Sequence, residues 1–359
     1  MLASYPIAIT KENWLHETLA NAIVLTHAAL DKGKPVPKWT TLLSKTLSSH
    51  QSSQLKLKHG LSSRFAIYQQ TVASLSTADR AHILQILQDQ NDIAGLTQGS
   101  TSIHNLKLNY LNVYDCVHDL FVFAYGLLTD LGVRDRQYSN LFDLLDTKFC
   151  PFCGFERLMS PQEARQDQDH YLAKSIYPFA AANMRNLVPM CRCCNRDYKH
   201  DIDILLDINK TRCVAFDPYI GHNLKISLVK SIPFQGKKLL PAWWIEFLPS
   251  STESDTWDYV FCIKTRYARE ILNLNYDRWL EGFRKHCVPR KYPTSLTDAQ
   301  ILDILKDHYA NLLIDPPVGV DFLKPHAFEM LIHHYSIGNS RVIAFIRNSV
   351  IGVSSKSST

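Results

Sequence analysis

The first 148 residues carry apolar side chains at the spacing of helices. Apolar positions recur every three or four residues from Leu15 to Leu30, which predicts an amphipathic helix. A second helix should begin near Ser76, because serine is a preferred residue at helix N-termini. The strongest pattern runs from Val113 to Leu131 and ends at Gly132. We therefore predict a mainly helical domain over residues 1–148.

The pattern changes in residues 206–359, where runs of β-branched and aromatic residues alternate with turn residues. The segments that predict strands are Arg212 to Tyr219, Leu224 to Val229, Ala242 to Leu248 and Tyr259 to Lys264. A long helix should follow from Arg266 to His286, and the capping-box pattern from Thr297 to Gln300 should open another. These elements predict an α+β C-terminal domain, and an α+β fold for the chain as a whole.

Composition narrows the class of protein without assigning a function. The chain has 359 residues, 46% hydrophobic and 20% charged, which is ordinary for a soluble globular protein of two or three domains. The longest apolar run, Leu120 to Leu128, is too short to cross a bilayer, so we expect no membrane span. The N-terminus lacks a basic start before an apolar run, so we expect no export signal. Nine cysteines, an odd number, fit a reducing cytoplasm better than a disulfide framework.

Two C-x-x-C pairs organise the segment between these domains, residues 149–205. The paired residues are Cys150 with Cys153 and Cys191 with Cys194. Two such knuckles are a strong signal for Zn²⁺, because four thiolates complete its tetrahedral coordination. A zinc ion held by four thiolates has no open position, so we expect it to be structural. Cys193 could compete with Cys194, but only Cys194 has the two-residue spacing of a knuckle.

The polar residues beside these knuckles are of the types that phosphodiester hydrolysis needs. Asp169 and Asn195 offer oxygen ligands to a hard divalent cation such as Mg²⁺ or Mn²⁺. His170 follows Asp169, and a neutral imidazole is a suitable base for deprotonating water near pH 7. On an extended strand, the side chains of these two neighbours point to opposite faces. We interpret Asp169, His170 and Asn195 as a catalytic site that the zinc knuckles hold in place.

This segment resembles the HNH endonuclease family in its four-cysteine zinc form. The matching residues are Cys150-Pro-Phe-Cys153, Asp169-His170-Tyr-Leu-Ala-Lys174, Asn186-Leu-Val-Pro189, Cys191-x-x-Cys194-Asn195 and Lys199. The match covers the region of the knuckles and leaves the flanking domains without a family. The resemblance implies a ββα-metal unit, in which a hairpin and a helix surround one catalytic cation.

The resemblance also implies a role for the matched polar residues. It makes His170 the general base, and it makes Asp169 and Asn195 the ligands of the catalytic cation. Asn186 is implied to orient the loop that positions the histidine. Many family members carry histidine where this chain has Asn195, whereas the phage nucleases of the family that resolve DNA junctions use asparagine there. His200 is an alternative ligand close by.

Charge adds a set of candidate contacts to nucleic acid. The formal net charge of +5 permits such binding but does not argue for it alone. Acidic and basic residues nearly balance within the zinc segment, so phosphate contacts must come from particular side chains. The basic residues near the proposed site are Arg185, Arg192, Arg196 and Lys199. We expect these four to bind nucleic acid, and the alternative for each is an ordinary solvated charge.

Three functions remain open at this point. The first is a metal-dependent endonuclease acting on DNA; by analogy with stand-alone HNH proteins of this size, it would be the effector of a bacterial restriction or anti-phage system. Such an effector would work in an oligomer or beside an ATPase or sensor subunit. The second is a non-catalytic zinc-bearing adaptor or nucleic-acid-binding protein, which would not need Asp169, His170 and Asn195 together. The third is an HNH nuclease acting on RNA, because the catalytic unit itself does not read a 2′-hydroxyl.

Overall fold

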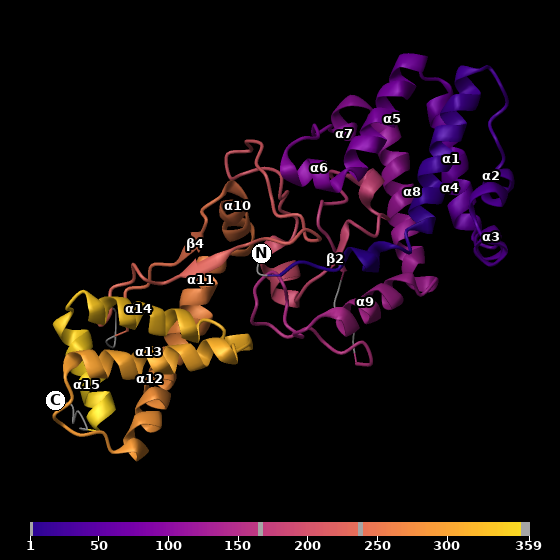
Figure 1. Ribbon diagram of the computed structural model, residues 1–359. Coiled ribbons are helices and arrows are strands. Elements are labelled where there is room, and N and C mark those ends of the chain that lie inside the picture. Colours follow the sequence, from indigo (N-terminus) through magenta and orange to yellow (C-terminus); the bar gives the residue numbers. More distant parts are fainter. Residues whose placement is uncertain (1–2, 164–167, 236–239, 353–359) are drawn as a thin grey trace. The chain divides into compact units, whose positions relative to one another are not determined.

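The computed structural model describes residues 3–163, 168–235 and 240–352. Its described strands form two antiparallel pairs, β1 (Gln168–His170) with β2 (Leu187–Pro189) and β3 (Lys225–Ser227) with β4 (Glu246–Leu248). Helices make up most of the rest, which confirms the predicted α+β class. The chain divides into two compact units, one mainly of residues 3–152 and 158–222 and the other mainly of residues 153–157 and 223–359 (Figure 1). The domain boundaries expected after residues 148 and 205 remain predictions.

A run of helices opens the first unit. These are η1 (Ile7–Thr10), α1 (Trp14–Asp31), α2 (Trp39–Thr46), α3 (Ser49–Lys56), α4 (His59–Ala73), α5 (Thr77–Asn91), α6 (Ile93–Gln98), α7 (Leu106–Asn109), α8 (Leu111–Asp130) and α9 (Val133–Leu144). The predicted helices are confirmed at α1, α5 and α8. Ser76 caps α5 by accepting a hydrogen bond from the backbone of Asp79, and Gly132 ends α8 with a left-handed φ of +66°. The sequence did not predict α9, because its buried side chains include Arg134 and Gln137.

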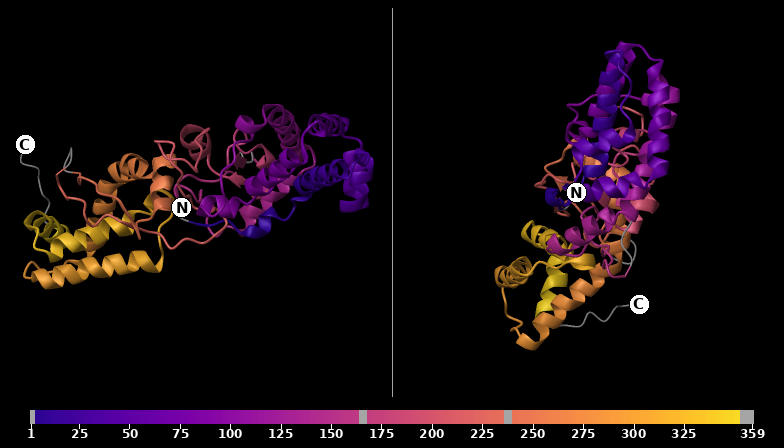
Figure 2. Two further views of the ribbon diagram at one scale, coloured as in Figure 1. Left: turned by 90° about the horizontal axis from the view of Figure 1, so that it is seen from above. Right: turned by 90° about the vertical axis from the view of Figure 1, so that its right-hand side faces the viewer.

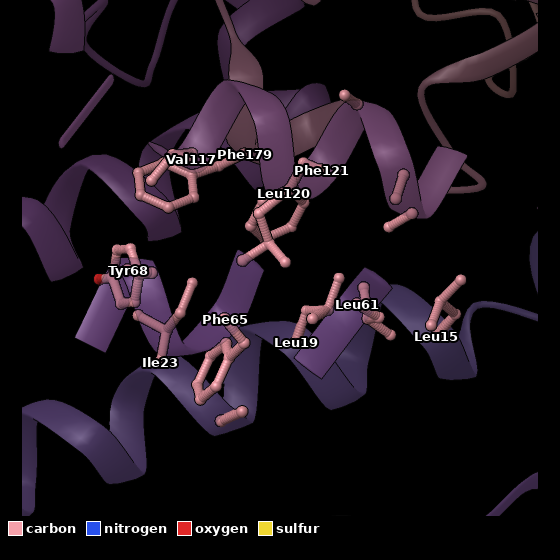
Figure 3. Packing of buried hydrophobic residues seen from close by; sticks show 14 of the residues in the cluster. Leu15, Leu19, Ile23, Leu61, Phe65, Tyr68, Val117, Leu120, Phe121 and Phe179 are labelled. Carbon is pink, nitrogen blue, oxygen red and sulfur yellow. The ribbon is translucent and has the colours of Figure 1, made fainter. Parts of the chain in front are cut away.

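Helices α1, α4 and α8 build the hydrophobic core of the first unit (Figure 3). The core residues that the figure labels are Leu15, Leu19, Ile23, Leu61, Phe65, Tyr68, Val117, Leu120, Phe121 and Phe179. Burying one large apolar side chain contributes about 1.5–3 kcal/mol, so a cluster of this size fixes the three helices firmly. The same core includes Met184 and Leu187, and Phe179 packs edge-on against Phe121 at 5.6 Å between ring centroids. The helical core therefore holds the segment that connects β1 to β2.

The remainder of the first unit has few regular elements. It contains the strands β1 and β2, the 3₁₀ turn η2 (Pro178–Ala180) and the π-helix η3 (Cys193–Lys199). The strand predicted from Arg212 to Tyr219 is wrong, since this segment forms a single bridge, between Leu206 and Arg212. No single helix among the described residues is long and apolar enough to cross a membrane; only α8 and α9 together, bent by 64°, pass by length and composition.

The second unit places its two-stranded sheet beside further helices. These are α10 (Thr252–Phe261), α11 (Ile263–Arg266), η5 (Tyr267–Leu272), α12 (Asn273–Cys287), η6 (Val288–Arg290), α13 (Asp298–Ile314), η7 (Gly319–Asp321), α14 (Lys324–Ser336) and α15 (Ser340–Ile351). Helices α12 to α15 pack against one another (Figure 2). The predicted strand from Tyr259 to Lys264 is wrong: these residues end α10 and begin α11. A capping box at Ser251 starts α10, and Trp257 and Phe261, four residues apart, bury one face of it.

Candidate active site and metal centre

Four buried cysteines come together in the structure. The Sγ atoms of Cys150, Cys153, Cys191 and Cys194 all lie within 4.8 Å of one another. A tetrahedral Zn²⁺ with bonds of about 2.3 Å would place its four thiolates roughly 3.8 Å apart, which fits this spacing. The backbone N–H of Cys191 donates to Cys150 Sγ, and that of Cys194 to Cys191 Sγ, each at 3.4 Å. The quartet can therefore hold a zinc ion, while Cys193 is half-buried and lies outside it.

The N-terminal segment covers this quartet. Tyr5 is only 1% exposed, its hydroxyl donates to the carbonyl of Pro189, and its ring centroid lies 6.1 Å from that of Phe152. Burial, followed by the nearby charge of Cys150, raises the pKa of Tyr5 well above its usual value. A closed set of four thiols leaves no open position for a substrate, so the cluster contributes by fixing the backbone around it.

The strand pair β1–β2 presents Asp169 and His170. Asp169 pairs with Val188 and His170 with Leu187, in antiparallel register. Along β1 the side chain of Asp169 is half-buried and that of His170 is buried, which is the alternation of an extended strand. The π-helix η3 follows β2 in the chain.

The imidazole of His170 is oriented by a backbone carbonyl. Its Nε2 lies 2.9 Å from the carbonyl oxygen of Ala181, and because a carbonyl only accepts, Nε2 carries the proton. Burial, followed by the charge of Lys174, lowers the pKa of His170 to about 3, so the ring is neutral near pH 7. A neutral ring protonated at Nε2 keeps its lone pair on Nδ1. In this tautomer Nδ1 is the ring nitrogen that can accept a proton.

Asn186 ties together the loop that supplies this carbonyl. The side chain is fully buried, and its Oδ1 accepts from the backbone N–H of Leu172 at 2.7 Å. Its Nδ2 donates to the carbonyls of Leu172 at 3.0 Å and Ala180 at 3.2 Å. Because Ala180 precedes Ala181, Asn186 links the chain just after His170 to the acceptor of the His170 hydrogen bond.

Lys199 brings Asp169 next to the helical segment that carries Asn195. Its Nζ lies 2.8 Å from Asp169 Oδ2 and donates to the carbonyl of His170 at 2.9 Å. Asn195 stands four residues earlier on η3 and is half-buried. Burial raises the pKa of Asp169, and the charge of Lys199 opposes that rise. By contrast, His200 is exposed and its Nδ1 lies 2.9 Å from Asp201 Oδ1.

Asp169 and Asn195 both carry oxygen atoms of the type that a hard divalent cation takes as ligands. Asp169 offers a carboxylate whose side chain is 14% exposed, and Asn195 offers an amide oxygen. The ion pair with Lys199 holds the Asp169 carboxylate in place, and a carboxylate has further lone pairs for a second partner.

The four basic residues expected to bind nucleic acid differ in their placement. Arg192 and Arg196 are exposed at η3. Arg185 is half-buried, pairs with the buried carboxylate of Asp217, and faces the Tyr219 ring. Lys199 is 1% exposed and pairs with Asp169. The prediction that it contacts nucleic acid at the surface is therefore wrong, because its side chain is buried and holds Asp169.

Three residues beside His170 were not among the predicted site residues. Tyr125 comes from α8, Arg134 from α9 and Lys174 from the turn that follows β1. The ring centroids of Tyr125 and His170 lie 4.4 Å apart, and both cations lie over the Tyr125 ring. Lys174 could have been found in sequence from its place after the Asp-His pair. The approach of α8 and α9 has no local signal, because it depends on packing.

A scan against protein-family models found no match for this chain, and searches of the curated proteins and of the solved structures found none either.

Proposed function

We propose that this chain is a metal-dependent endonuclease that hydrolyses phosphodiester bonds in DNA. The observation that carries the proposal is the hydrogen bond from His170 Nε2 to the Ala181 carbonyl, on a strand that also presents Asp169. This bond leaves Nδ1 as the basic nitrogen of a buried, neutral imidazole. A carboxylate and an amide for a cation stand within reach of the same segment, which is the set of groups that the reaction needs.

Each residue has a distinct part in the reaction. His170 takes a proton at Nδ1 from a water whose oxygen attacks the phosphorus, and the bond from phosphorus to the leaving oxygen then breaks. Asp169 and Asn195 would hold Mg²⁺ or Mn²⁺, which when bound stabilises the charge on the phosphate and on the leaving oxygen. Asn186 and Lys199 hold the loop and the strand that carry these groups.

The cysteine quartet acts through structure in this proposal. A zinc ion bound by Cys150, Cys153, Cys191 and Cys194 would fix the start of η3 relative to the rest of the segment. Cys194 is directly followed by Asn195, so the position of one cation ligand depends on the zinc knuckle.

The biological setting follows by analogy from the resemblance to HNH proteins. We infer an effector of a bacterial anti-phage or restriction system that acts with an ATPase or sensor subunit. One catalytic base cuts one strand in each event, so double-strand cleavage would require a dimer or two successive nicks.

A cleavage assay tests the proposal directly. Purified protein is incubated with supercoiled plasmid, linear duplex DNA and total RNA, each with Mg²⁺, with Mn²⁺ or with a chelator. We expect nicked plasmid with Mg²⁺ or Mn²⁺ and intact plasmid with the chelator. Cleavage of RNA alone would show that the substrate is RNA and not DNA. Binding of nucleic acid with no cleavage in any metal would favour a non-catalytic adaptor.

A further inference from the structure

The aromatic ring of Tyr125 lies against His170 and within reach of two cationic side chains. The guanidinium carbon of Arg134 lies 4.4 Å from the centroid of the Tyr125 ring, and Lys174 Nζ lies 5.4 Å from it. The same ring lies 4.4 Å from the imidazole of His170, at an angle of 56°. The helices α8 and α9 thus contribute to the surroundings of the proposed base.

Arg134 is fully engaged in structure. It is 7% exposed, its Nε donates to Gln168 Oε1 at 2.7 Å, and its Nη1 donates to Thr129 Oγ1 at 3.1 Å. Gln168 returns a hydrogen bond from Nε2 to the Arg134 carbonyl at 2.9 Å. Since Gln168 begins β1, this pair fixes α9 to the strand of the proposed site, and Tyr125 adds a hydrogen bond from its hydroxyl to the Gln168 carbonyl at 3.3 Å.

Lys174 is placed differently, with a fixed backbone and an accessible side chain. The Tyr114 hydroxyl of α8 donates to the carbonyl of Ser175 at 2.9 Å, and the Ala173 carbonyl accepts from Ile176 and Tyr177, both at 2.9 Å. The Lys174 side chain is half-buried, and no carboxylate among the described residues forms an ion pair with it. Its neighbour Lys199, by contrast, is neutralised by Asp169.

The charges near His170 favour an anion. Lys174 has no paired carboxylate in the described chain, while the opposite charges of Asp169 and Lys199 cancel each other. Of the two acidic residues on the preceding turns of α8, Asp119 pairs with Arg64 at 2.9 Å and Asp115 remains exposed. An accessible lysine over an aromatic ring, next to a general base, is suited to a phosphate group.

We propose that Lys174 binds a phosphate of the substrate strand and so holds that strand against His170, and that Tyr125 is a positioning residue for both side chains. This inference rests on the proposed nuclease function. It assigns to Lys174 the phosphate contact that the buried Lys199 cannot make. It also gives the helical domain a direct part in the reaction, because Tyr125 belongs to α8.

The test of Lys174 compares Lys174→Met, Lys174→Arg and Lys306→Met. Methionine keeps an apolar stem over the Tyr125 ring and removes the charge, and Lys306 is an exposed lysine of α13 that serves as a matched control. DNA affinity is measured without added Mg²⁺ or Mn²⁺ over a series of salt concentrations, and cleavage is measured with Mg²⁺. We expect Lys174→Met to lose about tenfold or more in affinity and to lower the salt slope by about 0.9, while Lys174→Arg and Lys306→Met stay near wild type.

The outcomes separate this inference from the proposed function. If Lys174→Met binds and cleaves like Lys306→Met, Lys174 is not the phosphate contact even though the nuclease stands. If the wild type binds DNA but does not cleave it, the nuclease proposal fails, and the salt slope still decides whether Lys174 contacts phosphate. If the wild type neither binds nor cleaves, both are overturned. Unchanged melting temperatures show that a loss does not come from unfolding.

The role of Tyr125 is tested by measuring kcat and KM separately in two variants. Tyr125→Phe keeps the ring beside His170, whereas Tyr125→Leu removes it. For a positioning role we expect Tyr125→Leu to lower kcat and raise KM, and Tyr125→Phe to restore both. A purely structural role would instead lower the melting temperature in Tyr125→Leu and leave the kcat and KM of the folded protein unchanged, which would overturn the assignment.

Discussion

The cysteine quartet and the surroundings of His170 lie within the same short stretch of chain but are built in different ways. The quartet consists of two knuckles, each formed by residues three apart, and all four thiols are buried. His170 depends on contacts from several places: a carbonyl at Ala181, a ring from α8 and a lysine from the turn after β1. A metal cluster can be encoded in local spacing, whereas a reactive side chain takes its properties from distant parts of the fold.

The largest expected effect comes from breaking the quartet. In Cys153→Ala the zinc-binding free energy, about 10–16 kcal/mol for structural sites, would be largely lost, and we expect this stretch to unfold. Zinc content, circular dichroism and cleavage should all fall together. A chelator strong enough to remove zinc from the wild type should have the same effect.

Cys193→Ala is the matched control for this change. Cys193 lies in the same knuckle but outside the quartet, so its variant should keep zinc and fold. If Cys193→Ala loses zinc while Cys194→Ala keeps it, the ligand set has been assigned incorrectly.

The second expected effect is a loss of cleavage without a loss of the folded structure. His170→Ala removes the proposed base, and we expect cleavage to fall by about 10²–10⁴-fold, the range for general-base catalysis. Zinc content should not change. His170→Gln, whose amide nitrogen can reach the position of the imidazole Nε2 and donate to the Ala181 carbonyl, should be equally inactive with less loss of stability.

His200→Ala controls for the loss of a nearby histidine. His200 is exposed and lies beside Asp201, so its removal should leave the cleavage rate close to that of the wild type. Nicking by His170→Ala at the wild-type rate would exclude His170 as the base.

A third effect concerns the loop that links the two regions. Asn186→Ala would leave the backbone N–H and carbonyl of Leu172 without their Asn186 partner in a buried site, while the Ala180 carbonyl keeps the N–H of Asn183. Each such group costs about 1–3 kcal/mol, so we expect a loss of roughly 2–5 kcal/mol in the free energy of unfolding. Urea unfolding measures it, and Asn195→Ala should lose cleavage with a much smaller change in stability. Equal losses of unfolding free energy in the two variants would contradict the structural role of Asn186 and the cation-binding role proposed for Asn195.

The sequence could predict what depends on local spacing. The quartet, the capped start of α5 at Ser76 and the apolar face of α8 each follow from residues within a few positions of one another. The placement of Lys199 could not be predicted, because its burial depends on β1 meeting η3. The same holds for Tyr125, which reaches His170 through the packing of α8. The strand expected from Tyr259 to Lys264 was wrong because burial of Trp257 and Phe261 on a helix face outweighs local β-propensity.

The smallest expected effect is on the pH dependence of stability. It distinguishes a loss of activity in acid that comes from the site from one that comes from unfolding of the core. Burial lowers the pKa of His16, in α1, from 6.5 to about 4, and its ring lies 5.9 Å from that of Phe121. The unfolded chain therefore binds the proton more tightly than the folded one. The stability from this group is present in full above about pH 6.5 and is lost as the pH falls towards 4. Between pH 8 and pH 5 the loss should be about 2 kcal/mol.

His16→Leu should remove this contribution and flatten the fall in unfolding free energy between pH 8 and pH 5. Urea unfolding at each pH measures it. Because burial lowers the pKa of His170 to about 3, this proposed base stays neutral over this range, and activity should follow the folded fraction. If the cleavage rate of His16→Leu still collapses at pH 5 while the protein stays folded, the loss of activity in acid comes from groups near His170. Unfolding of the core would then not explain that loss.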